Sequence, residues 1–296
     1  MELPPPPMFA DVQTLLAASQ PKRRVAWMTY ATTCMILAIL ITSLLSNRSA
    51  DEQQAFEAVS TFVMVLLVGG MFLYNGLQAR AQRAELGRLE AAEELVQLRR
   101  WPQAAMLLQS ILSQPTRTPH ARLQALVNFV NVLARFHRFE DVVTITEHVL
   151  ETTPLDSGGV HILKLSRAMA LLREDRLFDA DGAISDLRRS PEAAESGGLA
   201  LVELYRDVKT GHANEALVVF EKKRELIRRQ LGHRLGDAYM LAAVAQDQLN
   251  QTEAAQTSYR TATLLAPAAE LQRRYPETTR LAGKYQPELA PTEVAG

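Results

Sequence analysis

The chain has 296 residues, of which 47% are hydrophobic, enough to build a sizeable core. Its formal net charge of −1 argues against nucleic-acid binding, which needs a basic face. Because Cys34 is its single cysteine, neither a disulfide framework nor a multi-thiolate metal site can form within one chain.

The first segment, residues 1–24, is predicted to be an N-terminal tail. It opens with Pro4–Pro7, a polyproline run that favours an extended backbone. Asp11–Ser19 has the spacing of a short amphipathic helix lying near a membrane. A loose tail is the favoured interpretation.

Two uncharged runs follow, residues 25–46 and 58–79, and both are predicted to be transmembrane helices. Each has about 22 residues, which at ~1.5 Å per residue gives a helix of about 33 Å, long enough for a bilayer core of ~30 Å. The polar link between them is so short that the two runs must form a hairpin. A cleaved signal peptide is the alternative for the first run, but that run is too long and a second run follows.

Basic residues near the ends of the two runs predict the orientation of the hairpin. Lys22, Arg23 and Arg24 precede it, whereas Arg48 is the one basic residue of the link. Three more basic residues follow the hairpin: Arg80, Arg83 and Arg88. Positive residues stay in the cytoplasm, so both termini are predicted to be cytoplasmic.

Residues 80–285 are predicted to form a domain of helix–turn–helix repeats, followed by a loose tail at 286–296. In Leu123–Pro154, apolar residues recur at helical spacing on both sides of a short polar turn. Neither helix can bury its apolar face alone, so such units need neighbours. Equivalent anchor positions recur at intervals of 36 to 39 residues: Ala104, Val142, Ala180, Ala216 and Ala255. Twelve residues upstream, where two helices would cross closely, lie Ala92, Val130, Ala168, Leu204 and Ala243. After the repeats, Ala268–Arg274 is expected to be a capping helix.

This pattern resembles the tetratricopeptide repeat (TPR) family, whose unit is a helix–turn–helix of about 34 residues ending in a proline. The resemblance covers roughly residues 85–267 and is best in Leu123–Pro154 and Gly236–Pro267. The units are longer than the family's, and Ala, Val or Leu replaces the glycine usual in the first helix. The resemblance implies an all-α, TPR-like helix–turn–helix solenoid, here preceded by a transmembrane helical hairpin. An unrelated all-helical array is the alternative interpretation.

In TPR-like arrays the first helix of each repeat lines a concave groove. Arg135, Arg173 and Lys209 occupy equivalent places in the last turn of that helix, and stacked they would form a basic ladder. The predicted partner-binding groove comprises Val127, Asn131, Arg135, Leu165, Met169, Arg173, Tyr205 and Lys209. Such a groove would suit an acidic or carboxylate-ended peptide. The favoured alternative is that a basic residue simply suits the dipole at the C-terminal end of a helix.

No residue set supports a reaction, so no catalytic residue, cofactor or metal site is predicted and the chain is expected not to be an enzyme. No two of the six histidines share one helix at the spacing of metal ligands. His233 has Asp237 four residues on, but one such pair without a third ligand is a weak metal signal.

The sequence therefore predicts a membrane-anchored protein–protein interaction scaffold of the bacterial inner membrane. Its expected partners are the lipid bilayer and proteins or peptides, with acidic peptides favoured if the basic ladder binds. Two alternatives stay open. One is a periplasm-facing helper of envelope assembly or cytochrome maturation, and the other is a self-associating structural membrane protein, which would be a homo-oligomer.

Overall fold

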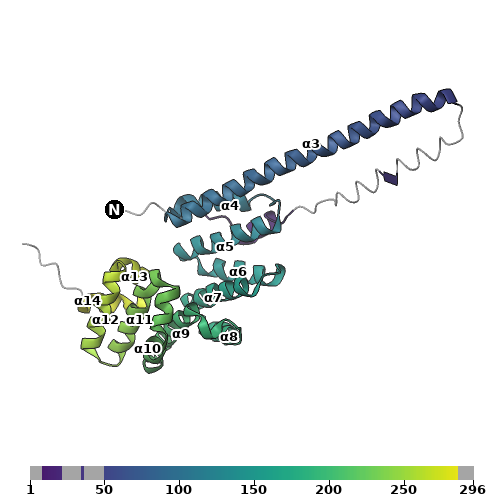
Figure 1. The fold of residues 1–296 in the computed structure, drawn as a ribbon. Helices are drawn as coiled ribbons and strands as arrows, with labels where there is room; N and C mark the ends of the chain where they lie inside the picture. The colour runs from purple at the N-terminus through teal and green to yellow at the C-terminus, as the bar shows by residue number, and fades with distance from the viewer. Residues whose placement is uncertain (1–8, 22–34, 37–49, 286–296) are drawn as a thin grey trace, which may run out of the picture. The chain divides into compact units, whose positions relative to one another are not determined.

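The computed structural model describes residues 9–21, 35–36 and 50–285, with only part of the side chains at the start of the last range. Every regular element in these ranges is a helix, which confirms the predicted all-α class (Figure 1). The chain divides into two compact units, Met1–Phe136 and His137–Gly296.

The first unit contains α1 (Val12–Ala18), α3 (Ala50–Gln97), α4 (Trp101–Leu112) and α5 (Pro119–Arg135). The end of α3 packs against α4 and α5, and α1 packs against α4. Thr118 caps α5, since its hydroxyl accepts a hydrogen bond from the Ala121 amide at 3.1 Å. Leu89, Leu108 and Phe129 are fully buried and form the centre of this small core.

The second unit is a longer array of helices joined by short turns. In chain order its helices are α6 (Phe139–Thr152), α7 (Ser157–Arg173), α8 (Leu177–Arg188), η1 (Ala193–Glu195), α9 (Gly197–Thr210), α10 (Ala213–Gln230), η2 (Gly232–Arg234), α11 (Leu235–Gln248), α12 (Thr252–Leu265), α13 (Ala268–Arg274), η3 (Pro276–Thr278) and α14 (Thr279–Tyr285). The elements labelled η are single turns of 3₁₀ helix.

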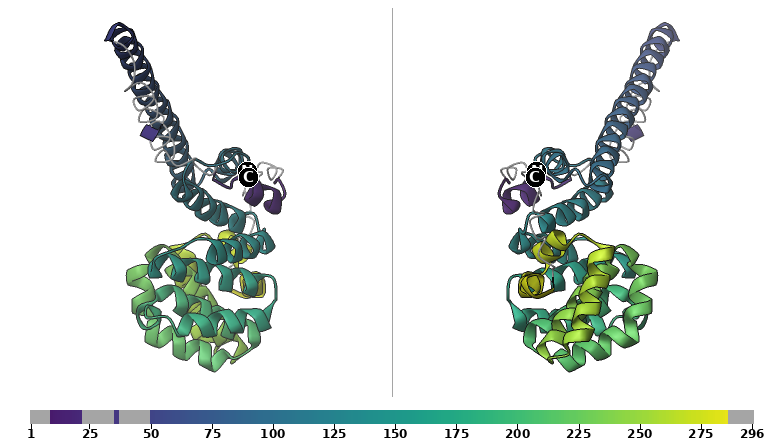
Figure 2. Two further views of the ribbon diagram at one scale, coloured as in Figure 1. Left: turned by 90° about the vertical axis from the view of Figure 1, so that its right-hand side faces the viewer. Right: turned by 90° about the vertical axis from the view of Figure 1, so that its left-hand side faces the viewer.

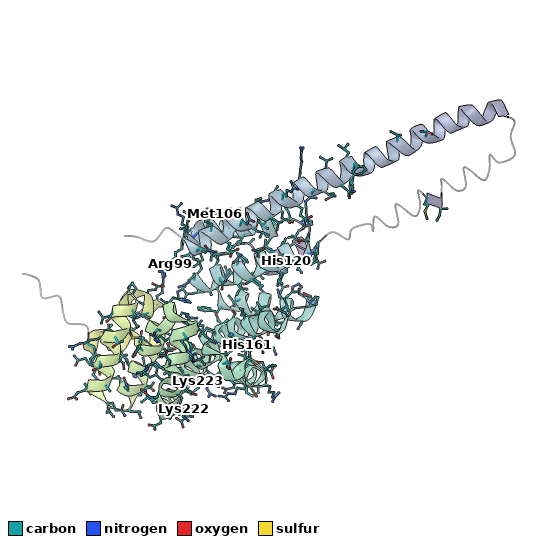
Figure 3. All side chains as sticks on the ribbon, viewed as in Figure 1. Arg99, Met106, His120, His161, Lys222 and Lys223 are labelled. Atoms are coloured by element: carbon teal, nitrogen blue, oxygen red, sulfur yellow. The ribbon has the colours of Figure 1, made fainter. Side chains whose placement is uncertain are left out.

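One turn geometry recurs through both units. A residue one or two positions after the first helix of each pair has a positive φ of 56° to 81°, and these residues are Arg99, His137, Asp175, Gly211 and Asn250. Figure 3 labels the first of them, Arg99. The next residue then donates its amide to a carbonyl in the last turn of the preceding helix, as from His212 to Asp207 at 2.8 Å. This is the Schellman ending of a helix, in which a left-handed residue lets the chain turn back.

The recurring turn gives the register of the repeats. Each positive-φ residue lies five positions before one of the predicted anchors, and all five anchors are at most 1% exposed. The five upstream positions predicted at helix crossings are also buried, at 3% exposure or less. The helix–turn–helix periodicity of 36 to 39 residues is therefore confirmed as geometry.

In the second unit the first helices of successive pairs, α7, α9 and α11, pack against one another. The second helices, α8, α10 and α12, pack against the first helix of their own pair, and α8 and α10 also against the next one. The helices α7, α9 and α11 therefore form one continuous row. This is the row that was predicted to line a groove.

Residues 9–19 do not form the loose tail that the sequence favoured. Asp11 accepts a hydrogen bond from the Thr14 amide at 2.8 Å and so caps α1. On α1, Val12, Leu15 and Leu16 are 3–4% exposed because they pack within the first unit. The tail prediction is wrong for this stretch because seven residues gave too short a periodic signal to weigh against the proline run.

The predicted first span, residues 25–46, lies almost wholly outside the described residues, and the predicted second span lies within α3. The backbone of α3 is one helix of 48 residues. A search of the described residues finds no helix that combines the length and the apolar content of a membrane span. Several side chains of α3 that are described are both apolar and more than half exposed: Val65, Phe72, Leu73, Tyr74 and Leu77.

The C-terminal helix α13 has the bounds predicted for the capping helix, Ala268–Arg274, and its Leu271 is fully buried. The two elements after it, η3 and α14, were not predicted. Tyr275, Leu281 and Tyr285 from this stretch are also buried. In Figure 2 the yellow C-terminal helices lie against the green helices of the second unit.

The turn geometry gives a matched pair of stability tests at two glycines with open space around them. Gly211 has φ +81°, whereas Gly182 lies inside α8. We expect Gly211→Ala to lower the free energy of unfolding by about 1–2 kcal/mol, because a side chain disfavours the left-handed region. Gly182→Ala should raise it by about 0.5–1 kcal/mol, because alanine favours a helix interior. Chemical denaturation measures both, and equal effects of one sign would contradict the turn assignment.

Candidate binding groove of the second unit

The row α7–α9–α11 brings together the predicted groove residues of the second unit. Leu165 and Met169 lie half-buried on α7. A methyl group at Gly198 of α9 would lie only 2.6 Å from Leu165 Cδ1, so glycine is what allows the two helices to approach here. The apolar part of the groove is thus built by close packing of the first helices of two repeats.

Tyr205 of α9 lies between two of the other predicted groove residues, Arg173 and Lys209. Its side chain is fully buried. The Arg173 guanidinium lies 5.1 Å from the centre of its ring and the Lys209 Nζ lies 5.5 Å from it. Both distances are within the range of cation–π attraction. Two members of the predicted basic ladder therefore converge on one aromatic ring.

The predicted groove residues Arg173, Tyr205 and Lys209 are in contact with the segment that follows α13. The Tyr275 ring meets the Tyr205 ring edge to face, with centroids 5.1 Å apart and an interplanar angle of 80°. The Arg173 guanidinium lies 4.4 Å from the centre of the Tyr275 ring. The Tyr205 hydroxyl donates to a Glu277 carboxylate oxygen at 3.1 Å, and the Lys209 Nζ lies 3.5 Å from the same atom. The basic ladder thus holds an aromatic ring and a carboxylate within this unit.

Lys209 also closes the end of the neighbouring helix. Its Nζ donates to the carbonyl oxygen of Leu172, in the last turn of α7, at 2.5 Å. It also lies 2.7 Å from a carboxylate oxygen of Asp175, the left-handed residue of the following turn. A cation in this place satisfies a free carbonyl and complements the helix dipole.

Burial determines the protonation state of the two tyrosine hydroxyls at this contact. It raises the pKa of the Tyr205 hydroxyl above its ordinary value, and the nearby Arg173 only partly offsets this. Burial likewise raises the pKa of Tyr275. The pKa of His137 is lowered, first by burial and then by the charges of Arg173 and Arg273. Both phenols therefore stay protonated near neutral pH and can donate hydrogen bonds.

A buried carboxylate on α11 anchors the segment before Tyr275. Asp237 has a side chain that is 1% exposed and accepts three hydrogen bonds. The donors are Arg234 Nε at 2.9 Å, Arg274 Nη1 at 2.5 Å and the Tyr275 hydroxyl at 3.1 Å. A buried charge is tolerated only where its hydrogen bonds are made in this way.

A second carboxylate on α11 anchors α14. Asp247 accepts from Lys284 Nζ at 2.5 Å and from the Tyr285 hydroxyl at 3.1 Å, and Arg280 lies 3.6 Å away. Burial raises the pKa of Asp247, but the hydrogen bonds from Lys284 and Tyr285 and the nearby positive charges lower it by more, so that the pKa lies below its ordinary value.

The other three predicted groove residues lie on α5 in the first unit. Val127 and Arg135 are half-buried and Asn131 is exposed. The Arg135 guanidinium lies 4.9 Å from the centre of a Trp101 ring, another cation–π contact. Arg135 belongs to the first unit, whereas Arg173 and Lys209 belong to the second. A basic ladder that runs from Arg135 to Lys209 therefore stays a prediction.

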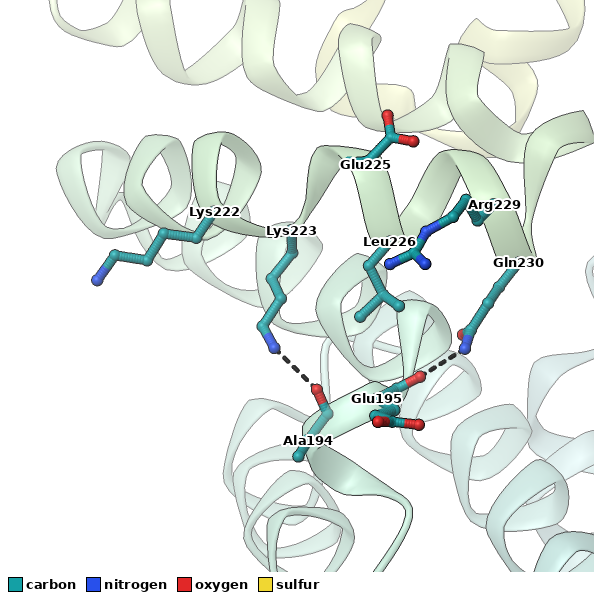
Figure 4. A pocket seen from close by; sticks show the side chains of 8 residues that line it. All are labelled: Ala194, Glu195, Lys222, Lys223, Glu225, Leu226, Arg229 and Gln230. Carbon is teal, nitrogen blue, oxygen red and sulfur yellow. Dashed lines mark hydrogen bonds between the residues drawn. The ribbon is translucent and has the colours of Figure 1, made fainter.

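A second hollow lies between η1 and α10, where the chain forms an open, charged depression (Figure 4). Lys223 donates to the Ala194 carbonyl at 2.9 Å, and Gln230 donates to the Glu195 carbonyl at 2.6 Å. Lys222 and Arg229 add positive charge, but Glu195 and Glu225 offset it. Such a depression, with little apolar lining, lacks the features of a ligand pocket.

The described residues contain no group of three His, Cys, Asp or Glu side chains placed to hold a metal ion. The one buried histidine among them, His161 on α7, lies between two hydroxyls, with Nδ1 3.1 Å from Ser190 Oγ and Nε2 2.8 Å from Ser196 Oγ. Ser196 also caps α9 by accepting from the Leu199 amide. This arrangement joins α7 to the end of α8 and to the start of α9.

Comparison with known proteins finds no match: neither a family model, nor a curated protein, nor a solved structure resembles the chain. Function has therefore to be argued from the chain's own geometry.

The Asp237 cluster predicts a large loss of stability. In Asp237→Asn the charge that pairs with Arg234 and Arg274 is removed, while both cations stay partly buried. We expect the free energy of unfolding to fall by about 3 kcal/mol, since breaking a buried ion pair leaves its partner uncompensated. The matched control is Asp186→Asn on α8, whose pair with Arg189 is well exposed and should change stability by less than about 0.5 kcal/mol. Similar losses for both would show that Asp237 is not an anchor.

The depressed pKa of Asp247 predicts a pH window. Its contribution is fully present above the unfolded pKa, near 3.8, and is lost as pH falls through the lower native pKa. The difference in thermal midpoint between the wild type and Asp247→Asn should therefore be constant from about pH 7 to pH 5 and shrink below about pH 4. A difference that persists unchanged to pH 3 would mean that the charge of Asp247 plays no part.

Proposed function

We propose that the chain is a membrane-anchored protein–protein interaction scaffold. A two-span hairpin within residues 25–79 would anchor it, and the TPR-like repeats would recruit protein partners to the membrane surface. The proposed mechanism is confinement: an anchored groove meets membrane-bound partners at a raised effective concentration.

The observation that carries the proposal is the way the first unit holds both ends of the apolar region. Thr116 donates its amide and its hydroxyl to the Ser19 carbonyl, at 3.4 Å and 2.9 Å. The next residue, Arg117, donates its amide to the Glu85 carboxylate at 3.0 Å. Residues 20–84 therefore leave from and return to neighbouring points. A segment that returns to its starting side must cross a bilayer an even number of times, and two apolar runs of sufficient length lie within it.

The N-terminal end of this region is firmly attached. Arg122 of α5 is 8% exposed and donates to the Leu16 carbonyl at 2.9 Å and to Ser19 Oγ at 3.1 Å. These contacts require α1 and the repeats to share one compartment. They therefore support a retained hairpin over a first run that is cleaved as a signal peptide, because cleavage would detach α1 from the rest of the chain.

The exposed apolar side chains of α3 support a bilayer as the partner of that helix. Phe72, Leu73 and Tyr74 follow one another and are all more than 60% exposed. Because a helix has about 3.6 residues per turn, three consecutive residues point in different directions, so the apolar exposure is not confined to one face of α3. Such exposure is unusual for a helix in water but suits a helix surrounded by lipid. The basic residues that flank the hairpin favour a bacterial inner membrane with both termini in the cytoplasm.

Cysteine labelling tests the anchor. In a Cys34→Ser background, Ser49→Cys would lie in the link between the spans and Ser113→Cys at the exposed end of α4. We expect a membrane-impermeant maleimide to label position 49 but not position 113 in intact cells, because the bilayer separates them. Both positions should react once the membrane is permeabilised, which is the control. Labelling of position 113 alone in intact cells would place the repeats outside the cytoplasm, and labelling of both would remove the hairpin.

A further inference from the structure

The segment from Tyr275 to Tyr285 occupies the groove as a bound peptide would. Its two key side chains reach across two helices, with Tyr275 against Arg173 and Tyr205, and Glu277 against Tyr205. An aromatic ring and, two residues later, a carboxylate are thus received by two cations and a phenol. These are directional contacts of the kind that select a ligand.

The fit of this segment is incomplete. Three buried polar atoms at the contact, Arg173 Nε, Glu277 Oε2 and Arg274 Nε, have no hydrogen-bond partner among the described residues. Native structures rarely leave buried polar groups unpaired, because each one lowers stability. Of these atoms only Arg173 Nε lies on the row α7–α9–α11. The chain's own segment therefore packs its aromatic ring against the row but leaves the Arg173 Nε donor unused, which a ligand with a suitably placed acceptor could satisfy.

The far end of the segment depends on its neighbours. The helix α14 has seven residues, too few to be stable by itself. It packs against α12 and η3 with Leu281 and Tyr285 buried, and Asp247 holds it through the Lys284 ammonium and the Tyr285 hydroxyl. Loss of the Asp247 charge would weaken both of these contacts and favour opening at this end. Local opening of η3 and α14 would therefore leave the row α7–α9–α11 intact.

We propose that Tyr275–Tyr285 is a displaceable intramolecular ligand that closes the groove of the second unit. The partner would carry an aromatic side chain and, two residues later, a carboxylate. Its ring would take the place of Tyr275 beside Arg173, and its carboxylate would receive the Tyr205 hydroxyl and Lys209. This inference rests on the proposed function as a scaffold and adds both the chemistry of the partner and a closed state of its site.

The test uses the full chain in detergent micelles and a fluorescent peptide with the sequence of residues 272–279, which holds Tyr275 and Glu277 but does not reach Asp247. Asp247→Asn loosens α14 without touching the groove, so the open state becomes more populated. Because apparent affinity scales with the population that is competent to bind, we expect the peptide to bind Asp247→Asn about tenfold more tightly than the wild type. Asp186→Asn is the matched control and should bind as the wild type does.

A second peptide carries Tyr275→Ala and Glu277→Lys, and we expect it to bind at least about tenfold more weakly to Asp247→Asn. Equal binding of the two peptides would overturn the assigned partner chemistry. Equal affinity of the first peptide for the wild type and for a folded Asp247→Asn would overturn displacement.

Hydrogen exchange of the wild type supplies a test that needs no variant. We expect the amides of η3 and α14 to exchange through a local opening that leaves those of α9 and α11 protected. Exchange of all four elements in a single event would show that the segment is an inseparable part of the fold. If the peptide binds but the cysteines are not labelled as expected, the membrane scaffold is contradicted and the binding site is retained. If the cysteines are labelled as expected but the peptide does not bind, only the displaceable ligand is contradicted.

Discussion

The structure depends on one constraint: an array of helix pairs leaves apolar faces that its own repeats cannot cover. Both units solve this with short helices from outside the repeats. In the first unit α1 buries Leu15 and Leu16, and in the second α13 buries Leu271, η3 buries Thr278, and Tyr275 between them is buried as well. Each of these helices has seven residues or fewer and would not be stable alone. They exist because they cover what the repeats leave exposed.

Covering these faces also determines where the rest of the chain can go. The contact of Arg122 with α1 fixes the beginning of residues 20–84, and the contact of Arg117 with Glu85 fixes their end. At the other terminus, Asp237 and Asp247 guide the chain after α12 back over α11. The need to cover apolar faces therefore brings the two ends of residues 20–84 together in the first unit. In the second unit it places the segment after α12 over α11.

The repeat register could be predicted from the sequence because it rests on local chemistry that recurs. Anchors such as Ala104 and Ala255 give the period, Ala92 and Ala243 mark the close crossings twelve residues upstream, and a left-handed residue lies five positions before each anchor. The C-terminal segment could not be predicted in this way. Tyr-Pro-Glu after α13 has no periodicity, and its position depends on Arg173 and Tyr205, which lie 70 or more residues earlier in the chain. In α1 the helical spacing was present but covered only seven residues, too few to outweigh the proline run before it.

Lys209 shows that one cation can complete the end of a helix and bind a carboxylate at the same time. Lys209 donates to the last turn of α7 and pairs with Asp175, as the dipole argument requires. Its Nζ also lies 3.5 Å from Glu277. A lysine has three donors, so one ammonium group can serve the helix end and a carboxylate at the same time. In the second unit, basic residues at two successive helix ends, Arg173 and Lys209, thus place two cations beside the Tyr205 ring, and Lys209 lies near the Glu277 carboxylate.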